Sequence, residues 1–323
     1  MTATARVSVA VPVFNEEQVL PELLARLLRA LGDIPGGPHE LVFVDDGSAD
    51  RTFEMLADAA ARDPRIVAIA LSRNFGHQIA ITAALDHVTG DLVVVMDGDL
   101  QDPPEAIAVL LDKQREGFDV VYAQRVRRKE GWLLRASYFL FYRAITTLST
   151  VRLPIDAGDF AVLSRRVVDR LKAAPEHHRY VRGLRAWVGY RQIGVPIERA
   201  RRDAGHSKYS ALRLMGLALD GVFAFSMAPL RLAAVLGAAA MFCSLLFAAY
   251  SIYVRLVAQR SPQGFTALIL AMTFLAGVQL FVMGIVGEYV GRIYEEVKRR
   301  PHYVIDRIAR QVSREAEGIQ RLT

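Results

Sequence analysis

The chain of 323 residues is basic, with a formal net charge of +6, and 52% of its residues are hydrophobic. Its mean hydropathy of +0.22 is high for a soluble enzyme, and its length allows a complete α/β domain plus a further segment. The single Cys243 excludes an internal disulfide, and the strand-like start of the chain does not resemble a signal peptide, so we expect a cytoplasmic N-terminal half.

Strand and helix patterns alternate over the first 200 residues. Short apolar runs predict strands at Val7–Val13, Glu40–Val44, Val67–Leu71, Val93–Met96 and Asp119–Tyr122. Amphipathic or apolar segments after the first and third of these runs predict helices. This alternation predicts an α/β domain with a mostly parallel sheet covered by helices. Polar residues follow every strand, which predicts one site at the strand ends.

The motif Asp97-Gly98-Asp99 directly follows the run Val93–Met96. Open α/β sheets bind their ligands at the carboxyl ends of their strands. Two carboxylates there suit a hard divalent cation, which typically also binds substrate phosphates. Acidic turns after strands are common, so the motif by itself leaves an ordinary turn as the alternative.

Two uncharged stretches lie near the end of the chain, Leu232–Val254 and Phe265–Gly287, with 23 residues each. Because about 20 apolar residues span a bilayer, both are predicted transmembrane helices. Basic residues are denser outside the pair than in the connection between the two stretches. The positive-inside rule therefore predicts a multi-pass protein of the inner (cytoplasmic) membrane with both termini in the cytoplasm.

Four strings of residues resemble the inverting GT-A glycosyltransferases of family 2: Val11-Pro12-Val13-Phe14-Asn15-Glu16-Glu17, Asp45-Asp46-Gly47-Ser48, Ser72-Arg73-Asn74-Phe75-Gly76-His77-Gln78 and Asp97-Gly98-Asp99-Leu100-Gln101-Asp102. More narrowly, the chain resembles the polyprenyl-phosphate glycosyltransferases, which include bactoprenol glucosyltransferases and dolichol-phosphate mannose synthases. The similarity continues through Gly158-Asp159-Phe160, Arg179–Gly183, Trp187–Tyr190, Ala204–Tyr209 and the two apolar stretches.

The resemblance and the apolar pattern together imply four regions. We expect a cytoplasmic GT-A catalytic domain at residues 1–208, an amphipathic juxtamembrane helix at 209–228, a two-helix transmembrane hairpin at 229–290 and a basic cytoplasmic tail at 291–323. Residues 132–148 mix aromatic and basic side chains, as residues 209–227 do, which is typical of helices that lie flat at a membrane surface. Ordinary core helices are the alternative for both segments.

The resemblance also implies the donor site. A divalent cation, Mg²⁺ or Mn²⁺, would be held by Asp97, Asp99 and Gln101 and would neutralise the departing diphosphate, which makes Asp99 a catalytic residue. The nucleotide sugar would be bound by Pro12, Phe14, Glu16, Asp45, Asp46, Asp97 and Gly98. For the turn from Asp45 to Ser48, a helix N-cap is the alternative reading.

The acceptor implied by the resemblance is a polyprenyl phosphate, whose phosphate would be bound by Arg125, Arg202 and Lys208. Residues 179–213 contain nine basic and two acidic residues, although attraction to anionic lipid explains part of this excess. Asp159 and Arg125 are expected catalytic residues. A phosphate is already largely anionic near pH 7, so we expect Asp159 to orient the acceptor or its cations more than to take a proton. A turn carboxylate is the alternative.

The resemblance thus implies a transferase that moves glucose from UDP-glucose onto polyprenyl (undecaprenyl) phosphate at the cytoplasmic membrane face, making a lipid-linked sugar donor for cell-envelope glycan modification. GDP-mannose and UDP-aminoarabinose derivatives are alternative donors. A processive polysaccharide synthase and a non-catalytic membrane assembly protein are alternative classes. Nucleic acid is not an expected partner, because the positive charge gathers near the apolar stretches. Small residues in these stretches permit a homo-oligomer.

Overall fold

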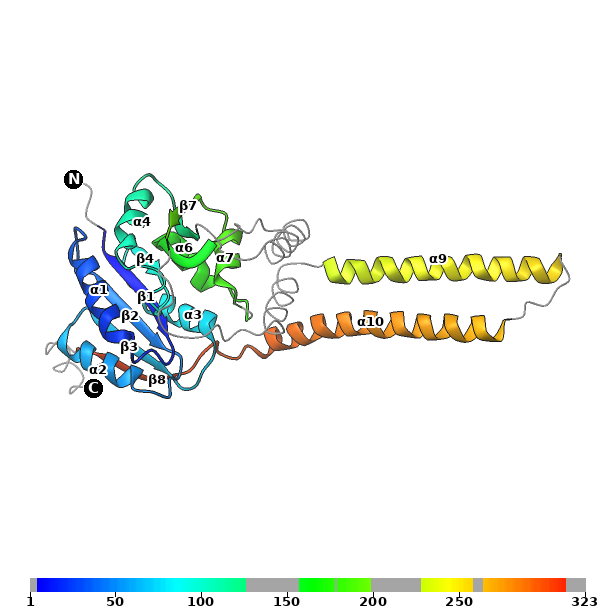
Figure 1. Ribbon diagram of the computed structural model, residues 1–323, viewed down its shortest axis with the longest axis horizontal. Helices are drawn as coiled ribbons and strands as arrows, with labels where there is room; N and C mark the ends of the chain where they lie inside the picture. Colours follow the sequence, from blue (N-terminus) through cyan, green and yellow to red (C-terminus); the bar gives the residue numbers. More distant parts are fainter. Residues whose placement is uncertain (1–4, 126–156, 178, 199–227, 258–263, 312–323) are drawn as a thin grey trace. The chain divides into compact units, whose positions relative to one another are not determined.

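The computed structural model describes residues 5–125, 157–177, 179–198, 228–257 and 264–311. The chain forms two compact units: the first contains a sheet and its covering helices, and the second contains two long helices (Figure 1). The predicted interfacial helix at 132–148 lies outside the described residues. The same holds for Arg202, Lys208 and nearly all of the predicted juxtamembrane helix at 209–228.

The sheet of the first unit has the strand order β7-β5-β6-β4-β1-β2-β3-β8. Its parallel half consists of β4 (Leu92–Val95), β1 (Val7–Val13), β2 (Glu40–Asp45) and β3 (Ile66–Leu71). Next to β4, β6 (Ala157–Ser164) runs antiparallel, followed by β5 (Val120–Arg125) and β7 (Gln192–Ile197), which are parallel to each other. At the other edge, β8 (Ile305–Arg310) pairs antiparallel with β3. The predicted α/β class with a mostly parallel sheet is confirmed.

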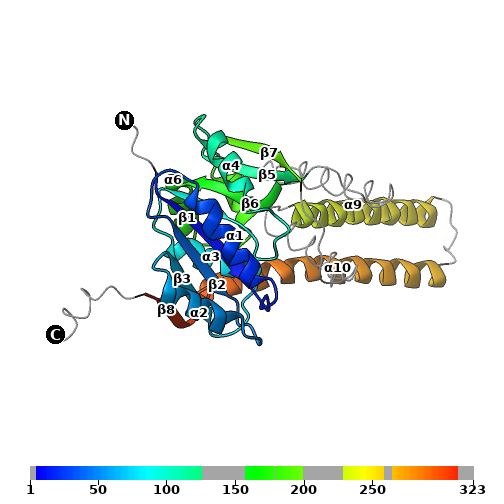
Figure 2. The same cartoon turned by 60° about the vertical axis from the view of Figure 1, so that its left-hand side comes forward.

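Helices cover both faces of this sheet (Figure 2). One face packs against α1 (Leu20–Gly32), α2 (Thr52–Arg62) and α4 (Ala106–Gln114). The opposite face packs against α3 (His77–His87), α6 (Arg165–Ala173) and α7 (Val181–Trp187). All seven residues of β1 are buried, because the strand has a helical layer on each side. This explains why the central strands are continuous apolar runs instead of alternating patterns.

Three strands were not predicted from the sequence: β6, β7 and β8. The sequence of β6, Ala157-Gly-Asp-Phe-Ala-Val-Leu-Ser164, begins with residues that strands disfavour, and pairing with both β4 and β5 decides its conformation. β5 extends three residues beyond the predicted run, so Arg125 ends that strand. Part of the predicted cytoplasmic tail, Ile305–Arg310, is β8 of the sheet.

The second unit contains α9 (Ala228–Leu256) and α10 (Phe265–Lys298), which include the two predicted apolar stretches and extend beyond them. Many of their large apolar side chains are exposed, including Phe242 and Phe274. Among the described residues, one segment, Phe274–Lys298, is long and apolar enough to cross a membrane, and α9 contains the shorter apolar segment Ala233–Phe247. The helices are thus observed, while a double crossing of the membrane belongs to the proposal below.

Candidate active site

The carboxyl ends of β1, β2, β3 and β4 lie at one edge of the parallel half of the sheet. From β1 the chain proceeds to β2 and β3 on one side, and then returns to form β4 on the other side of β1. The order of the strands therefore reverses between β1 and β4. Such a switch point leaves a crevice for ligands outside the strand ends. The Asp97–Asp99 turn follows β4 at this position.

The Asp97–Asp99 turn is tightly held against β1. A Cβ atom at Gly98 would lie 2.7 Å from Val13 Cγ1 and 3.1 Å from the Pro12 carbonyl oxygen, so only glycine fits without a shift. Asp99 Oδ1 accepts a hydrogen bond of 3.1 Å from the Gln101 backbone N–H. Leu100, between these two residues, has a positive φ of 56°. The sharp bend brings Asp97, Asp99 and Gln101 into one short turn.

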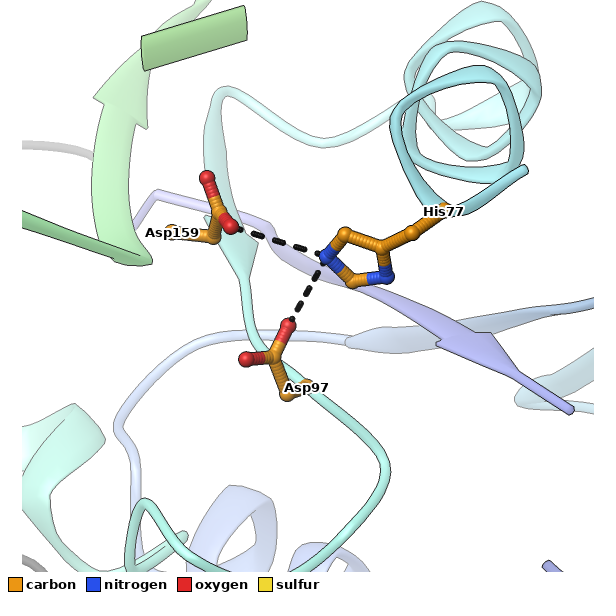
Figure 3. A group of neighbouring side chains, drawn as sticks. All are labelled: His77, Asp97 and Asp159. Carbon is orange, nitrogen blue, oxygen red and sulfur yellow. Dashed lines mark ion pairs between the residues drawn. The ribbon is translucent and has the colours of Figure 1, made fainter. Parts of the chain in front are cut away.

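Three side chains from separate elements meet beside this turn (Figure 3). His77 is the first residue of α3, and its Nε2 lies 3.3 Å from Asp97 Oδ1 and 3.5 Å from Asp159 Oδ2. Burial acts to lower the pKa of His77, but the interactions with Asp159 and Asp97 outweigh it and raise the pKa to about 10. The imidazolium therefore bridges two carboxylates that come from β6 and from the end of β4.

Asp159 is buried, with 4% of its side chain exposed, and it is paired a second time. Arg182 of α7 donates from Nε to Asp159 Oδ1 at 2.8 Å and from a terminal nitrogen to Oδ2 at 2.9 Å. Burial acts to raise the pKa of Asp159, but His77 and Arg182 hold that pKa well below its usual range. Asp159 therefore lies in a strand, between the cations His77 and Arg182. The alternative that it is a turn carboxylate is wrong.

The two acidic residues at the end of β2, Asp45 and Asp46, stabilise loops of the site. Asp46 accepts hydrogen bonds from the backbone N–H groups of Phe75, at 2.7 Å, and Gly76, at 2.9 Å. This fixes the segment that leads into His77. Asp45 accepts from the backbone N–H and the hydroxyl of Ser48. Burial raises the pKa of both carboxyl groups.

The end of β1 carries the other predicted nucleotide-binding residues. Pro12 is buried within the strand, and Phe14, two residues later, has 46% of its surface exposed. Asn15 has a positive φ of 54° and connects to the turn after β2, since its N–H donates to Ser48 Oγ at 2.8 Å. The Glu16 N–H donates to Thr52 Oγ1 at 2.9 Å. The loops after β1 and β2 therefore form one hydrogen-bonded surface, whose contacts with a nucleotide remain a prediction.

Residues outside the predicted set complete the site. His77 is part of a quoted motif but was not expected to contact Asp97, and the arginines of α7 had no predicted role. Among the predicted acceptor residues, Arg125 ends β5, two strands away from β4 and the Asp97–Asp99 turn, and its side chain lies outside the described part of the chain. A histidine directly after a strand-end loop was the available signal for His77. No local pattern distinguishes Arg182.

The donor atoms at the turn fit a divalent cation. Asp97 and Asp99 provide carboxylates and Gln101 an amide, while the ligand atoms of His77, Asp97 and Asp159 all lie within 4.8 Å of one another. Oxygen ligands of this kind suit Mg²⁺ or Mn²⁺. Because both oxygens of Asp159 accept hydrogen bonds from Arg182, the turn from Asp97 to Gln101 is the better candidate for binding the cation.

Residues 8–172 match the family model described as "Glycosyl transferase family 2", and residues 228–293 match the "GtrB C-terminal hairpin". An uncharacterized glycosyltransferase of Synechocystis is 41% identical over 303 residues, which cover 94% of this chain and 95% of that protein. The bactoprenol glucosyl transferase of Shigella phage SfII is 40% identical over 301 residues, with 93% and 97% covered.

Among solved structures, a mannosyltransferase from Pyrobaculum calidifontis in complex with GDP-Man and Mn²⁺ covers 90% of this chain and 88% of its own. It is 20% identical, with a TM-score of 0.45.

Proposed function

The chain belongs to glycosyltransferase family 2, and from this premise we propose that it transfers glucose from UDP-glucose to polyprenyl phosphate. The products are polyprenyl-phosphate glucose and UDP. The observation that supports this best is the 40% identity to a bactoprenol glucosyl transferase over nearly the full length of both chains. The Asp97–Asp99 turn at the switch point of the sheet is where such a donor would bind.

On the donor side, Asp97, Asp99 and Gln101 would hold a Mg²⁺ or Mn²⁺ ion. When bound, this ion supplies charge neutralisation for the diphosphate leaving group. The nucleoside would lie against Phe14, which is exposed at the end of β1. Pro12, Glu16, Asp45, Asp46 and Gly98 complete the predicted donor set. Asp46 contributes by fixing the Phe75–Gly76 loop, in addition to any contact with the base.

On the acceptor side, an oxygen of the lipid phosphate forms the new bond to the anomeric carbon as the bond to UDP breaks. Attack from the face opposite the leaving group inverts the configuration. Arg125, Arg202 and Lys208 are the predicted phosphate ligands. An arginine suits this role because its planar fork binds two phosphate oxygens.

The acceptor's apolar tail requires a membrane. We propose that α9 and α10 cross it as a hairpin, with the catalytic domain and both termini in the cytoplasm and the region between the helices outside. Support comes from the exposed apolar side chains of both helices, from the match of residues 228–293 to a hairpin family, and from the distribution of basic residues.

A donor panel tests the proposal. The purified protein is incubated with a short-chain polyprenyl phosphate and radiolabelled UDP-glucose, UDP-aminoarabinose derivative or GDP-mannose, in Mg²⁺ or Mn²⁺. We expect organic-phase label from UDP-glucose, and no label from an Asp99→Ala variant. Label from GDP-mannose alone would correct the donor, whereas no lipid product from any nucleotide sugar would overturn the reaction class.

A further inference from the structure

Two arginines of α7 hold the dipeptide Gly158-Asp159 of β6. Arg182 pairs with both carboxylate oxygens of Asp159, at 2.8 and 2.9 Å. Arg185 donates to the Gly158 carbonyl oxygen at 3.2 Å. Residues three apart lie on the same side of a helix, which lets both arginines reach the one strand. The side chain and the backbone of this dipeptide are therefore both fixed by α7.

The two arginines differ in what can reach them. Arg185 is 3% exposed, and its guanidinium lies over the ring of Tyr122, 5.3 Å from the ring centroid. A ligand at the surface therefore does not contact Arg185 directly. The Arg182 side chain is 31% exposed, so part of it faces solvent. Arg182, Arg185 and Asp159 together carry a net charge of +1. An anion that binds at this surface meets Arg182 first.

The position of this group on the sheet separates it from the nucleotide side. The predicted nucleoside-binding residues lie at the carboxyl ends of β1 and β2, whereas β6 lies on the opposite side of β4. The Asp97–Asp99 turn at the end of β4 lies between the two halves. A sugar transferred at this turn would leave the nucleotide bound on the β1 side of β4 and join an acceptor bound on the β6 side. Arg182 and Asp159 thus lie on the acceptor's half.

We propose that Arg182 binds the phosphate of the acceptor and that Asp159 positions Arg182, acting neither as a cation ligand nor as a general base. This inference rests on the proposed function, since it requires a phosphate acceptor. Such an acceptor brings an anionic oxygen, which forms the bond to the anomeric carbon without giving up a proton. A carboxylate that engages both prongs of the guanidinium restricts its orientation, which reduces the cost of ordering it when phosphate binds.

The test compares Arg182→Gln, Arg182→Lys and Asp159→Asn with a matched control, Arg166→Gln. Arg166 forms the same two-pronged pair with Asp119 in the same domain. Initial rates are measured against polyprenyl phosphate and against UDP-glucose. The affinities for UDP and for Mn²⁺ are measured by calorimetry without acceptor. Thermal unfolding of each variant reports whether its fold is retained.

Arg182→Gln should raise the KM for polyprenyl phosphate by about 10-fold or more, the usual effect of losing a charged hydrogen bond. Asp159→Asn should raise it less, and Arg182→Lys should be intermediate, because lysine keeps the charge without the planar fork. UDP and Mn²⁺ affinities should stay unchanged in all three. Arg166→Gln should behave as the unmodified protein. If Arg182→Gln fails to fold, the Arg182→Lys values decide the outcome.

Three outcomes overturn the inference. A fall in kcat with an unchanged acceptor KM in Asp159→Asn would make Asp159 a base, and a loss of Mn²⁺ affinity would make it a cation ligand. Weaker UDP binding in Arg182→Gln would place Arg182 on the donor side. Failure of the proposed function is distinguishable, because the unmodified protein would then fail to glucosylate polyprenyl phosphate at all.

Discussion

Gly98→Ala is a one-methyl perturbation of the turn that carries Asp97 and Asp99. The added Cβ would lie 2.7 Å from Val13 Cγ1 and 3.1 Å from the Pro12 carbonyl oxygen, and both distances are too short for ordinary contact. Val13 is buried, and a branched side chain at Cβ has little freedom to rotate away. Because the Pro12 oxygen belongs to the backbone of β1, the turn itself has to move.

The expected effect on rate exceeds the effect on stability. Overpacking by one methyl group costs about 1–3 kcal/mol, equivalent to a few degrees in Tm for a domain of this size. A shift of about 1 Å in a catalytic group costs roughly 100-fold in rate. We therefore expect Gly98→Ala to fold, to lose about 100-fold in kcat and to bind Mn²⁺ in the presence of UDP more weakly.

The measurement is turnover with UDP-glucose and polyprenyl phosphate, together with calorimetric titration of Mn²⁺ and a thermal melt. Gly32→Ala is the matched control, because a Cβ at Gly32 has no heavy atom within 4 Å and its backbone conformation suits alanine. Full activity and unchanged Mn²⁺ affinity in Gly98→Ala would refute the reasoning that close packing on β1 fixes the turn.

Asp99→Ala should abolish turnover while membrane insertion is retained, and activity that persists in this variant with EDTA would contradict cation-dependent catalysis. Glu40→Ala should lower the stability of the catalytic domain by about 3 kcal/mol, because the buried carboxylate accepts hydrogen bonds from Ser8 and Thr89 at the amino ends of the parallel strands, remote from the site. Denaturant unfolding measures the loss, and an unchanged midpoint would refute it. In a Cys243→Ser background, Ser261→Cys should react with impermeant thiol reagents in intact cells, whereas tags at both termini should be protected. The reverse pattern would overturn the orientation.

The buried parallel strands were predictable because their signal is local. β1, β2, β3 and β4 are covered by helices on both faces, so each is an apolar run that ends at polar residues. The Asp97–Asp99 turn was predictable for the same reason, since its position depends on the end of one strand. The long helices α9 and α10 follow from uncharged stretches of 23 residues. In each case neighbouring residues carry the information.

The antiparallel half of the sheet was not predictable from such signals. β6 begins with Ala157, Gly158 and Asp159, and it is a strand because β4 and β5 pair with it on both sides. β8 follows α10 and returns to pair with β3 across more than 230 residues of chain. These pairings depend on hydrogen bonds to distant partners, which the residues of the strand do not encode by themselves.

The sequence by itself determined the family resemblance, the two apolar helices and the acidic turn, because each depends on residues close together in the chain. Only the tertiary structure decided what surrounds that turn. His77 from α3 and Arg182 from α7 meet Asp159 of β6 because both helices pack on the same face of the sheet. The charge state of Asp159 follows from this meeting, since two cations from distant parts of the chain offset the cost of burying its carboxylate.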